Sequence, residues 1–319
     1  MTRKNLLRWL AAGVAVVWCI LFLRSDNTQK SIVRAMLLEQ TETGWSAGLL
    51  YQFPEASADA SETDAPIRFA LAAGKTPQAA LRKVEEKLPR KASYRLCDYL
   101  LLGQESDLGT LQDCEALFLE HPYGRLSSRV TLAAFSGAEL ESETEEEESL
   151  PETLLEQLEA DDAAPHLYEN RNGILLPVLE LEEGELSGRE ERVLLTGTGK
   201  TLLTAEQTET ALFLSGAANV CRLQNDTDPL ELTALAQSVE AEGDGFHLLL
   251  TCRCPSGSRR PSEEELARWT ALCGETVTRC WENGFDLLRL GAVRRLQKES
   301  DVLTTKNACP ELRTDVVLF

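Results

Sequence analysis

The stretch LLTGTGKTLL, residues 194–203, decides how the second half of the chain is interpreted. Its Gly-Lys-Thr at positions 199–201 matches the end of a phosphate-binding loop, G-x-x-x-x-G-K-[ST]. That loop needs an earlier glycine, which lets backbone N–H groups converge on a phosphate. Position 194, where this glycine would stand, is a leucine within the apolar run 193–195. The stretch is therefore predicted to be a strand end and a turn, and not a nucleotide site.

Hydrophobic periodicity before this stretch predicts three strands, then a helix, a strand, a helix and a strand. The first helix opens at Thr76, an N-cap, with Pro77 at the first helical position. The predicted strands are 31–40, 45–53, 66–74, 94–103 and 129–137, and the second helix covers 108–122. Consecutive strands favour an α+β fold over a doubly wound sheet, which needs a helix after nearly every strand.

Capping boxes mark two helices after position 203. Thr204 with Gln207 opens a helix that runs to Leu214, and Ser262 with Glu265 opens a longer one. The longer helix carries one apolar stripe, at 266, 269, 273, 277, 280 and 284, which is predicted to pack across a sheet. Strands are predicted at 174–183, 191–199, 218–223, 245–254 and 314–319. The predicted fold class is therefore multi-domain α+β, with mixed or antiparallel sheets packed against helices.

The chain is strongly acidic, with a formal net charge of -20 over 319 residues. Such a charge argues against nucleic acid as a partner, because a phosphate backbone would be repelled. Part of the acidity is ESETEEEE, residues 141–148, a like-charge run that repels itself and stays solvated. We interpret residues 141–172, with a short helix at 151–159, as a linker rather than a cation-binding tail. It would separate an N-terminal domain, 29–140, from a C-terminal domain, 173–319.

Residues 1–28 are predicted to be a membrane signal or anchor segment. Basic residues at positions 3, 4 and 8 precede the apolar run 9–23, which places the N-terminus in the cytoplasm and the remainder outside. The run is short of the roughly 20 residues that span a bilayer. No small-x-small cleavage site follows it, which favours an uncleaved anchor over a cleaved peptide. Lipidation of Cys19 stays open, although bulky Trp18 stands where a lipoprotein signal needs a small residue.

The cysteines and histidines form no pattern typical of a catalytic or metal site. The nine cysteines include a C-x-C pair at 252 and 254, which lacks the spacing of a zinc knuckle and has no second pair. Cys273 and Cys280 share a helix face with apolar neighbours, which indicates packed thiols. None of the three histidines stands near a nucleophile and an acid. We therefore predict no catalytic, metal-binding or cofactor-binding residues and no cofactor.

Two blocks of the chain resemble the Ger(x)C family, the C subunits of spore germinant receptors. The first runs from position 74 to 140. Its matching positions are Gly74, Thr76, Ala80 and Leu81 at the start, Gly103 at a strand end, and Arg125 and Val130 in the last part. The second runs from 176 to 216 and resembles the opening of the family's C-terminal domain, where a strand and a small turn lead to a displayed segment and a helix. Gly197 and Gly199 take the place of that turn.

The segment WENGFDLLRLGAVRRL, residues 281–296, completes the match, with Asp286 and Gly291 in a D-x-x-x-x-G pattern. The order and spacing of these motifs carry the resemblance, and it covers most of the chain after the N-terminal segment. The chain departs from the family at Trp18, before Cys19. It departs again at 309–311, which read Cys-Pro-Glu, since the family often has a tryptophan soon after a proline there.

The resemblance implies a multi-domain α+β protein without enzymatic activity. Such C subunits act beside a membrane A subunit and a multi-pass B subunit, on the extracytoplasmic face of the spore inner membrane. The complex responds to small-molecule germinants and triggers ion release. The positions of the family pattern with an expected structural role are Gly74, Gly103, Gly199, Asp286 and Gly291. An unrelated membrane-anchored extracytoplasmic binding or scaffold protein stays open as the alternative.

Overall fold

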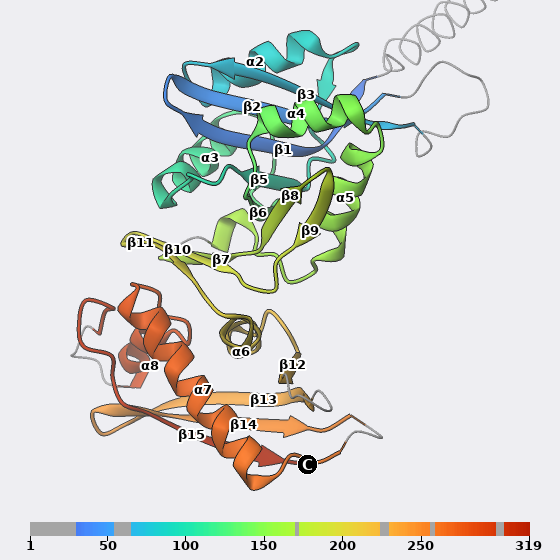
Figure 1. The fold of residues 1–319 in the computed structure, drawn as a ribbon. Coiled ribbons are helices and arrows are strands. Elements are labelled where there is room, and N and C mark those ends of the chain that lie inside the picture. Colours follow the sequence, from blue (N-terminus) through green and yellow to red (C-terminus); the bar gives the residue numbers. More distant parts are fainter. Residues whose placement is uncertain (1–29, 54–64, 170–171, 224–229, 256–258, 298–302) are drawn as a thin grey trace, which may run out of the picture.

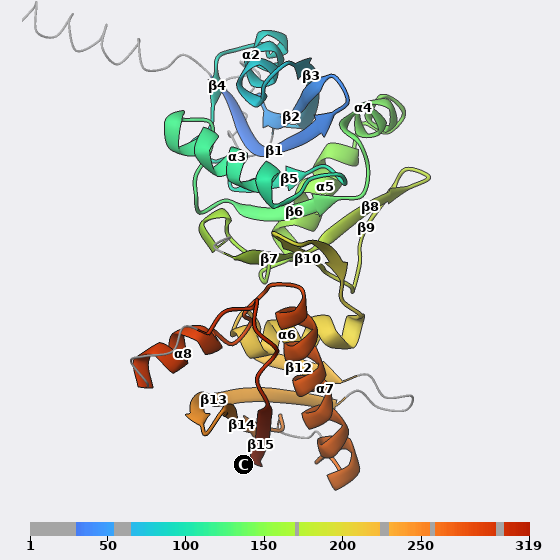
Figure 2. The ribbon, with the colours of Figure 1, turned by 90° about the vertical axis from the view of Figure 1, so that its left-hand side faces the viewer.

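The computed structural model describes residues 30–53, 65–169, 172–223, 230–255, 259–297 and 303–319. These residues form three sheets, stacked one above another and covered by helices (Figure 1). The view turned by 90° shows the same stacking order (Figure 2). The predicted α+β class with mixed sheets is confirmed, because parallel and antiparallel pairs occur within one sheet. The predicted anchor, 1–28, lies outside the described residues, and within these no helix is long and apolar enough to cross a bilayer.

The first sheet has the strand order β3-β2-β1-β5-β6-β8-β9, with β4 paired to β1. Strands β3, β2 and β1 run antiparallel, β1, β5, β6 and β8 run parallel, and β9 returns antiparallel to β8. The bounds are β1 Ser31–Thr41, β2 Gly44–Gln52, β3 Ile67–Gly74, β4 Ala92–Ser93, β5 Tyr99–Leu102, β6 Arg129–Ala133, β8 Val178–Glu182 and β9 Glu185–Gly188. We call this sheet and its helices the N-terminal unit.

Helices cover both faces of the first sheet. Helices α2 (Pro77–Lys87) and α3 (Leu108–Glu120) share one apolar cluster with Met36, Leu38 and Leu100. Helices α4 (Gly137–Glu146) and α5 (Leu150–Ala160) share another with Leu37 and Leu101. Neighbouring residues of β1 and β5 therefore belong to opposite faces, which explains the continuous apolar runs 35–38 in β1 and 99–102 in β5.

The acidic segment differs from the predicted linker. Residues 141–146 belong to α4, which opens with a capping box between Ser136 and Glu139. The next helix, α5, buries Leu150, Leu154, Leu155 and Leu158 against the sheet. Leucines recurring at helical spacing dock the segment, while its glutamates stay on the solvent side. The chain also stays in the first sheet beyond the predicted boundary at 173, through β8 and β9.

A small sheet of three strands lies between the N-terminal unit and the rest, in the order β11-β10-β7. Its strands are β7 (Gly173–Leu176), β10 (Val193–Thr196) and β11 (Gly199–Leu202). We call it the junction sheet, because its two faces serve different cores. Leu195 packs into the core of the N-terminal unit, whereas the adjacent Leu194 packs into the C-terminal core. Both faces are buried, so β10 is an unbroken apolar run without polar alternation.

The C-terminal unit is a four-stranded sheet in the order β12-β13-β14-β15, with helices on one side. Its elements are α6 Ala205–Ser215, β12 Val220–Leu223, β13 Leu230–Glu242, β14 Gly245–Arg253, α7 Glu263–Glu282, α8 Leu290–Gln297 and β15 Leu312–Leu318. Helix α7 lies across the sheet (Figure 1) and buries the middle of the predicted stripe, with Trp269 at 1% exposure and Cys273 at 0%. The ends of the predicted stripe differ, since Leu266 is half-buried and Gly284 lies beyond the last helical residue, Glu282. The strand predicted at 314–319 forms β15, which pairs parallel with β14.

Candidate functional site

The stretch that suggested a phosphate loop is the β10–β11 hairpin. Thr196 pairs with Gly199, so residues 197–198 form a two-residue turn between antiparallel strands. The predicted strand end and turn are confirmed. Gly199 has φ of 136°, a backbone conformation that L side chains rarely adopt, while open space surrounds its Cβ position. Backbone conformation, and not a phosphate, accounts for the glycine at 199.

The hairpin touches the two units at once. On the N-terminal side the Lys200 ammonium donates a hydrogen bond to the carbonyl oxygen of Gln104. On the C-terminal side Thr198 Oγ1 donates to the carbonyl oxygen of Asn283 at 2.8 Å, and Thr201 Oγ1 donates to its side-chain Oδ1 at 2.6 Å. Asn283 ends α7, and its amide nitrogen donates to the carbonyl of Arg279 at 2.8 Å. The hairpin therefore holds a loop of the first unit and the end of α7.

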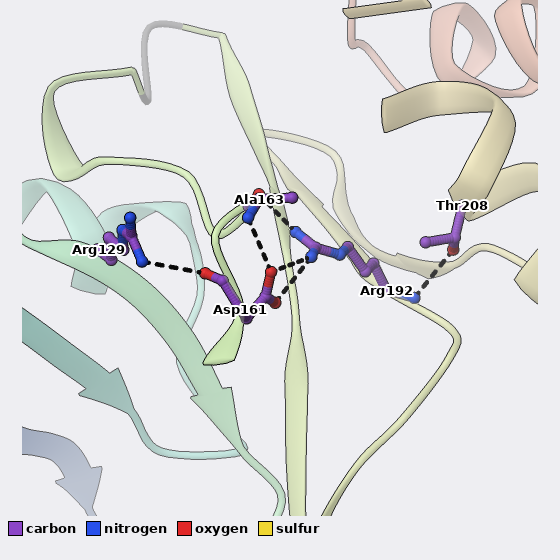
Figure 3. A network of polar contacts seen from close by, with 5 residues as sticks. All are labelled: Arg129, Asp161, Ala163, Arg192 and Thr208. Atoms are coloured by element: carbon purple, nitrogen blue, oxygen red, sulfur yellow. Dashed lines mark hydrogen bonds and ion pairs between the residues drawn. The ribbon is translucent and has the colours of Figure 1, made fainter. Parts of the chain in front are cut away.

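A buried arginine forms the second connection of the junction (Figure 3). The Arg192 side chain, from the turn before β10, donates to both oxygens of Asp161 at 2.8 and 2.7 Å. It also donates to the carbonyl of Ala163 at 2.9 Å. Its own backbone N–H donates to Thr208 Oγ1 in α6 at 3.1 Å, and Arg129 of β6 lies beside the carbonyl of Asp161 at 3.4 Å. The network joins α5, β6, the junction sheet and α6.

Burial makes this network structurally important. Arg192 as a whole is 6% exposed, so its charge is removed from water and needs a partner. The Asp161 carboxylate supplies that partner, because a single guanidinium nitrogen, Nη2, donates to both of its oxygens while Nη1 donates to Ala163. The polar groups of the network bond to one another, which suits a rigid connection more than a reactive centre. Sequence analysis missed Arg192 and Asp161. The sequence signal that could have indicated this network is a charged residue, Arg192, directly before the buried strand β10.

Burial makes several thiols of this protein unreactive. Burial raises the pKa of Cys97, Cys114, Cys221 and Cys280 to about 12 and that of Cys252 to about 11. The thiolate is the nucleophile and the metal ligand, so these groups stay protonated and unreactive near neutral pH. Burial also raises the pKa of Cys273, which confirms the predicted packed thiols on α7. Within the described residues, no group of His, Cys, Asp and Glu is arranged to hold a metal ion.

Gly74 and Gly103, two of the matching positions in the block 74–140, lie where chain segments approach closely. A Cβ at Gly74 would come within 2.3 Å of the backbone nitrogen of Ala80, so β3 ends directly against the start of α2. A Cβ at Gly103 would come within 2.5 Å of Glu39 Cβ on β1. The Gly103 N–H also donates to the carbonyl of Leu38 at 3.0 Å. Both positions need a residue without a side chain.

Asp286 and Gly291 form one structural unit at the start of α8. The Asp286 carboxylate accepts hydrogen bonds from the N–H groups of Leu290 at 2.7 Å and Gly291 at 2.9 Å. A Cβ on Gly291 would lie 2.7 Å from the carbonyl oxygen of Leu303. Asp286 therefore satisfies N–H groups that the helix itself leaves unbonded, and Gly291 lets the returning chain pass close to the helix.

Comparisons with known proteins give matches among solved structures. No family model matches the chain, and no curated protein matches it. Among solved structures that match, one is described as "Crystal Structure of the GerBC protein". The alignment covers 89% of this chain and 96% of that one, with 14% sequence identity and a TM-score of 0.46. A likeness at this level does not assign a function.

Proposed function

We propose that the protein is a non-enzymatic C subunit of a spore germinant receptor, acting with membrane A and B subunits in nutrient-triggered germination. The proposal rests on the resemblance of residues 74–140, 176–216 and 281–296 to the Ger(x)C family. The sequence positions that carry this resemblance have specific structural roles. Positions that matched a loose pattern by chance would not be expected to have such roles. We further propose that the A and B subunits, and not a nucleic acid, are its partners.

One observation carries the proposal more than the others. The D-x-x-x-x-G pattern at 286–291 is a helix cap and a close chain approach in one motif, with the Asp286 carboxylate on two N–H groups of α8. Such a motif keeps both residues and their spacing for a physical reason. The same holds for Gly74 and Gly103, where a Cβ has no room. Each position of the pattern therefore has a structural role, as expected of a family signature.

We propose that the described residues lie on the extracytoplasmic face of the spore inner membrane, held there by residues 1–28. The basic charges before the apolar run favour this orientation. Most native cysteines of the described residues are buried, and Cys254 and Cys309 are only partly exposed, so native cysteines are poor reporters of sidedness. A cysteine introduced at Glu156, which is exposed on α5, is a better reporter.

The sidedness experiment uses Glu156→Cys in the full chain and a membrane-impermeant maleimide on intact protoplasts, with the native chain as background. Labelling without permeabilisation is expected. Labelling that occurs only after permeabilisation would place the unit in the cytoplasm and overturn the orientation.

The functional experiment removes the gene in a strain with no second receptor of the same specificity. Nutrient germination should be lost, while germination by stimuli that bypass the receptors should persist. Reintroducing the native chain should restore the nutrient response. Normal nutrient germination in the deleted strain would reject the proposal in favour of an unrelated anchored binding or scaffold protein.

A further inference from the structure

A cleft of about 220 Å³ lies at the junction of the two units. Its walls come from the loop 162–169 of the N-terminal unit, from β7, from α6 and the turn after it, and from the loop that follows α7. A cavity of about 150 Å³ accommodates a benzene ring, and pockets for drug-sized molecules begin at about 300 Å³. The cleft therefore has the size for a small organic molecule.

Among the described residues that line the cleft, the charged side chains are the carboxylates of Asp162 and Glu169. Arg129 lies 3.2 Å from Asp162 Oδ1, which leaves the second oxygen of this exposed carboxylate available. Glu169 is exposed at the end of a short 3-10 helix, Leu167–Glu169. These two carboxylates favour a cation over an anion at the rim, where Arg129 offsets part of the charge of Asp162.

The neutral side chains that line the cleft also offer acceptors. His166 Nδ1 lies 2.7 Å from the carbonyl oxygen of Ser127. A carbonyl only accepts, so Nδ1 carries the proton and, in the neutral ring, Nε2 is an acceptor. The ring is held in place by stacking on Tyr168, with centroids 5.2 Å apart. Ser215 donates its hydroxyl proton to the carbonyl of Leu212 at 3.0 Å, and its oxygen accepts from the N–H of Ala217 at 3.4 Å, which leaves one lone pair to accept from a ligand.

Other residues that line the cleft are apolar, and they include Leu212 of α6, Leu175 of β7, and Phe285 and Leu287 after α7. A ligand that suits both sets of residues has hydrogen-bond donors, positive charge and a hydrocarbon body. These features describe an organic amine in its ammonium form, with a body about the size of one aromatic ring.

We propose that this cleft binds a small organic amine, with its ammonium group among Asp162, Glu169 and His166 and its apolar body against Leu212 and Phe285. The inference does not depend on the role proposed above, since it follows from the lining of the cleft. An anion is rejected by charge. A neutral molecule of the same shape lacks the ionic contacts with Asp162 and Glu169.

The test is calorimetric titration of the full chain in detergent at pH 7 with three matched probes. They are 2-phenylethylamine, the neutral 2-phenylethanol and the anion 3-phenylpropanoate. The amine should bind saturably at one site, at least about tenfold more tightly than the alcohol, which corresponds to about 1.4 kcal/mol. The anion should show no saturable binding. Absence of saturable amine binding, or equal binding of amine and alcohol, would overturn the proposal.

Three variants locate the binding. Asp162→Asn/Glu169→Gln should weaken amine binding by about fivefold or more, as expected from two partly exposed ionic contacts. Ala217→Trp, at an exposed position on the cleft wall, should block it. Glu156→Gln removes an exposed carboxylate of α5 outside the cleft and should leave it unchanged. Retained affinity in the first two variants, or equal loss in the third, would place the amine elsewhere and refute the site. Thermal unfolding of each variant confirms that it is folded.

Discussion

Replacing Arg192 with methionine should destabilise the protein more than any surface charge change, because Arg192 connects the two units. The change removes two charge-assisted bonds to Asp161, at 2.8 and 2.7 Å, and one bond to the carbonyl of Ala163. It keeps most of the apolar volume of the side chain. Breaking a buried pair costs about 3–5 kcal/mol. The Asp161 side chain is 30% exposed and can regain water, so the expected loss is about 2–4 kcal/mol.

The assay is urea unfolding of the full chain in detergent, followed by tryptophan fluorescence and by circular dichroism. Trp45 reports on the N-terminal unit, and Trp269 and Trp281 report on the C-terminal core. Because the junction sheet belongs to both cores, the loss should appear with both probes. Arg189→Met is the matched control. Arg189 pairs with Glu180, but its side chain is 40% exposed, so its loss should be below about 1 kcal/mol.

A double-mutant cycle isolates the pair itself. Asp161→Ala alone leaves Arg192 buried without its carboxylate, and adding Arg192→Met removes that unpaired charge. The double variant should therefore be more stable than the sum of the two single losses predicts, by about 1–3 kcal/mol. Additive losses, or an Arg192→Met variant within about 0.5 kcal/mol of the native chain, would refute the reasoning.

Three further changes test other parts of the structure. Trp269→Ala should cost about 3–5 kcal/mol and unfold the C-terminal unit, because the ring is 1% exposed and packs edge-on against Phe213; a native-like denaturation midpoint would contradict this packing. Asp286→Ala should cost only about 0.5–2 kcal/mol by uncapping α8, and an equal cost for Asp286→Asn would argue against an ionic contribution. Lys200→Ala should leave stability within about 0.5 kcal/mol. If the native chain binds ATP saturably and this variant does not, the interpretation of residues 194–201 as a phosphate-binding loop would be supported instead.

Local signals in the sequence predicted the elements with strong caps and periodicity. The capping boxes at Thr204 and Ser262 both form, with Glu265 N donating to Ser262 Oγ at 3.2 Å. The pKa of Glu265 is held well below its usual range by Arg259 and Ser262. The stripe of α7 is buried from Trp269 to Cys280, as the spacing predicted. These features depend on residues within one or two turns of each other, so a sequence alone can reveal them.

The parts that sequence analysis missed depend on distant partners. It assigned no strand to residues 230–242, LELTALAQSVEAE, which are rich in helix formers. They form β13 because β12 and β14 pair with it on either side. The acidic segment was predicted to be a linker from its charge, although leucines just after it dock α5. The cleft and the Arg192 network join residues far apart in the chain, and no local sequence pattern predicts either of them.

The most direct measurement for the receptor proposal is quantitative affinity purification. The full chain, tagged at its C-terminus, would be isolated from detergent-solubilised spore membranes, and all co-purifying proteins would be quantified by mass spectrometry. We expect two membrane proteins in fixed ratio to the chain, one of them multi-pass, and the same three proteins in one peak by size-exclusion chromatography. A chain that elutes alone, or with partners whose amounts vary independently of it, would contradict the assignment as a receptor subunit.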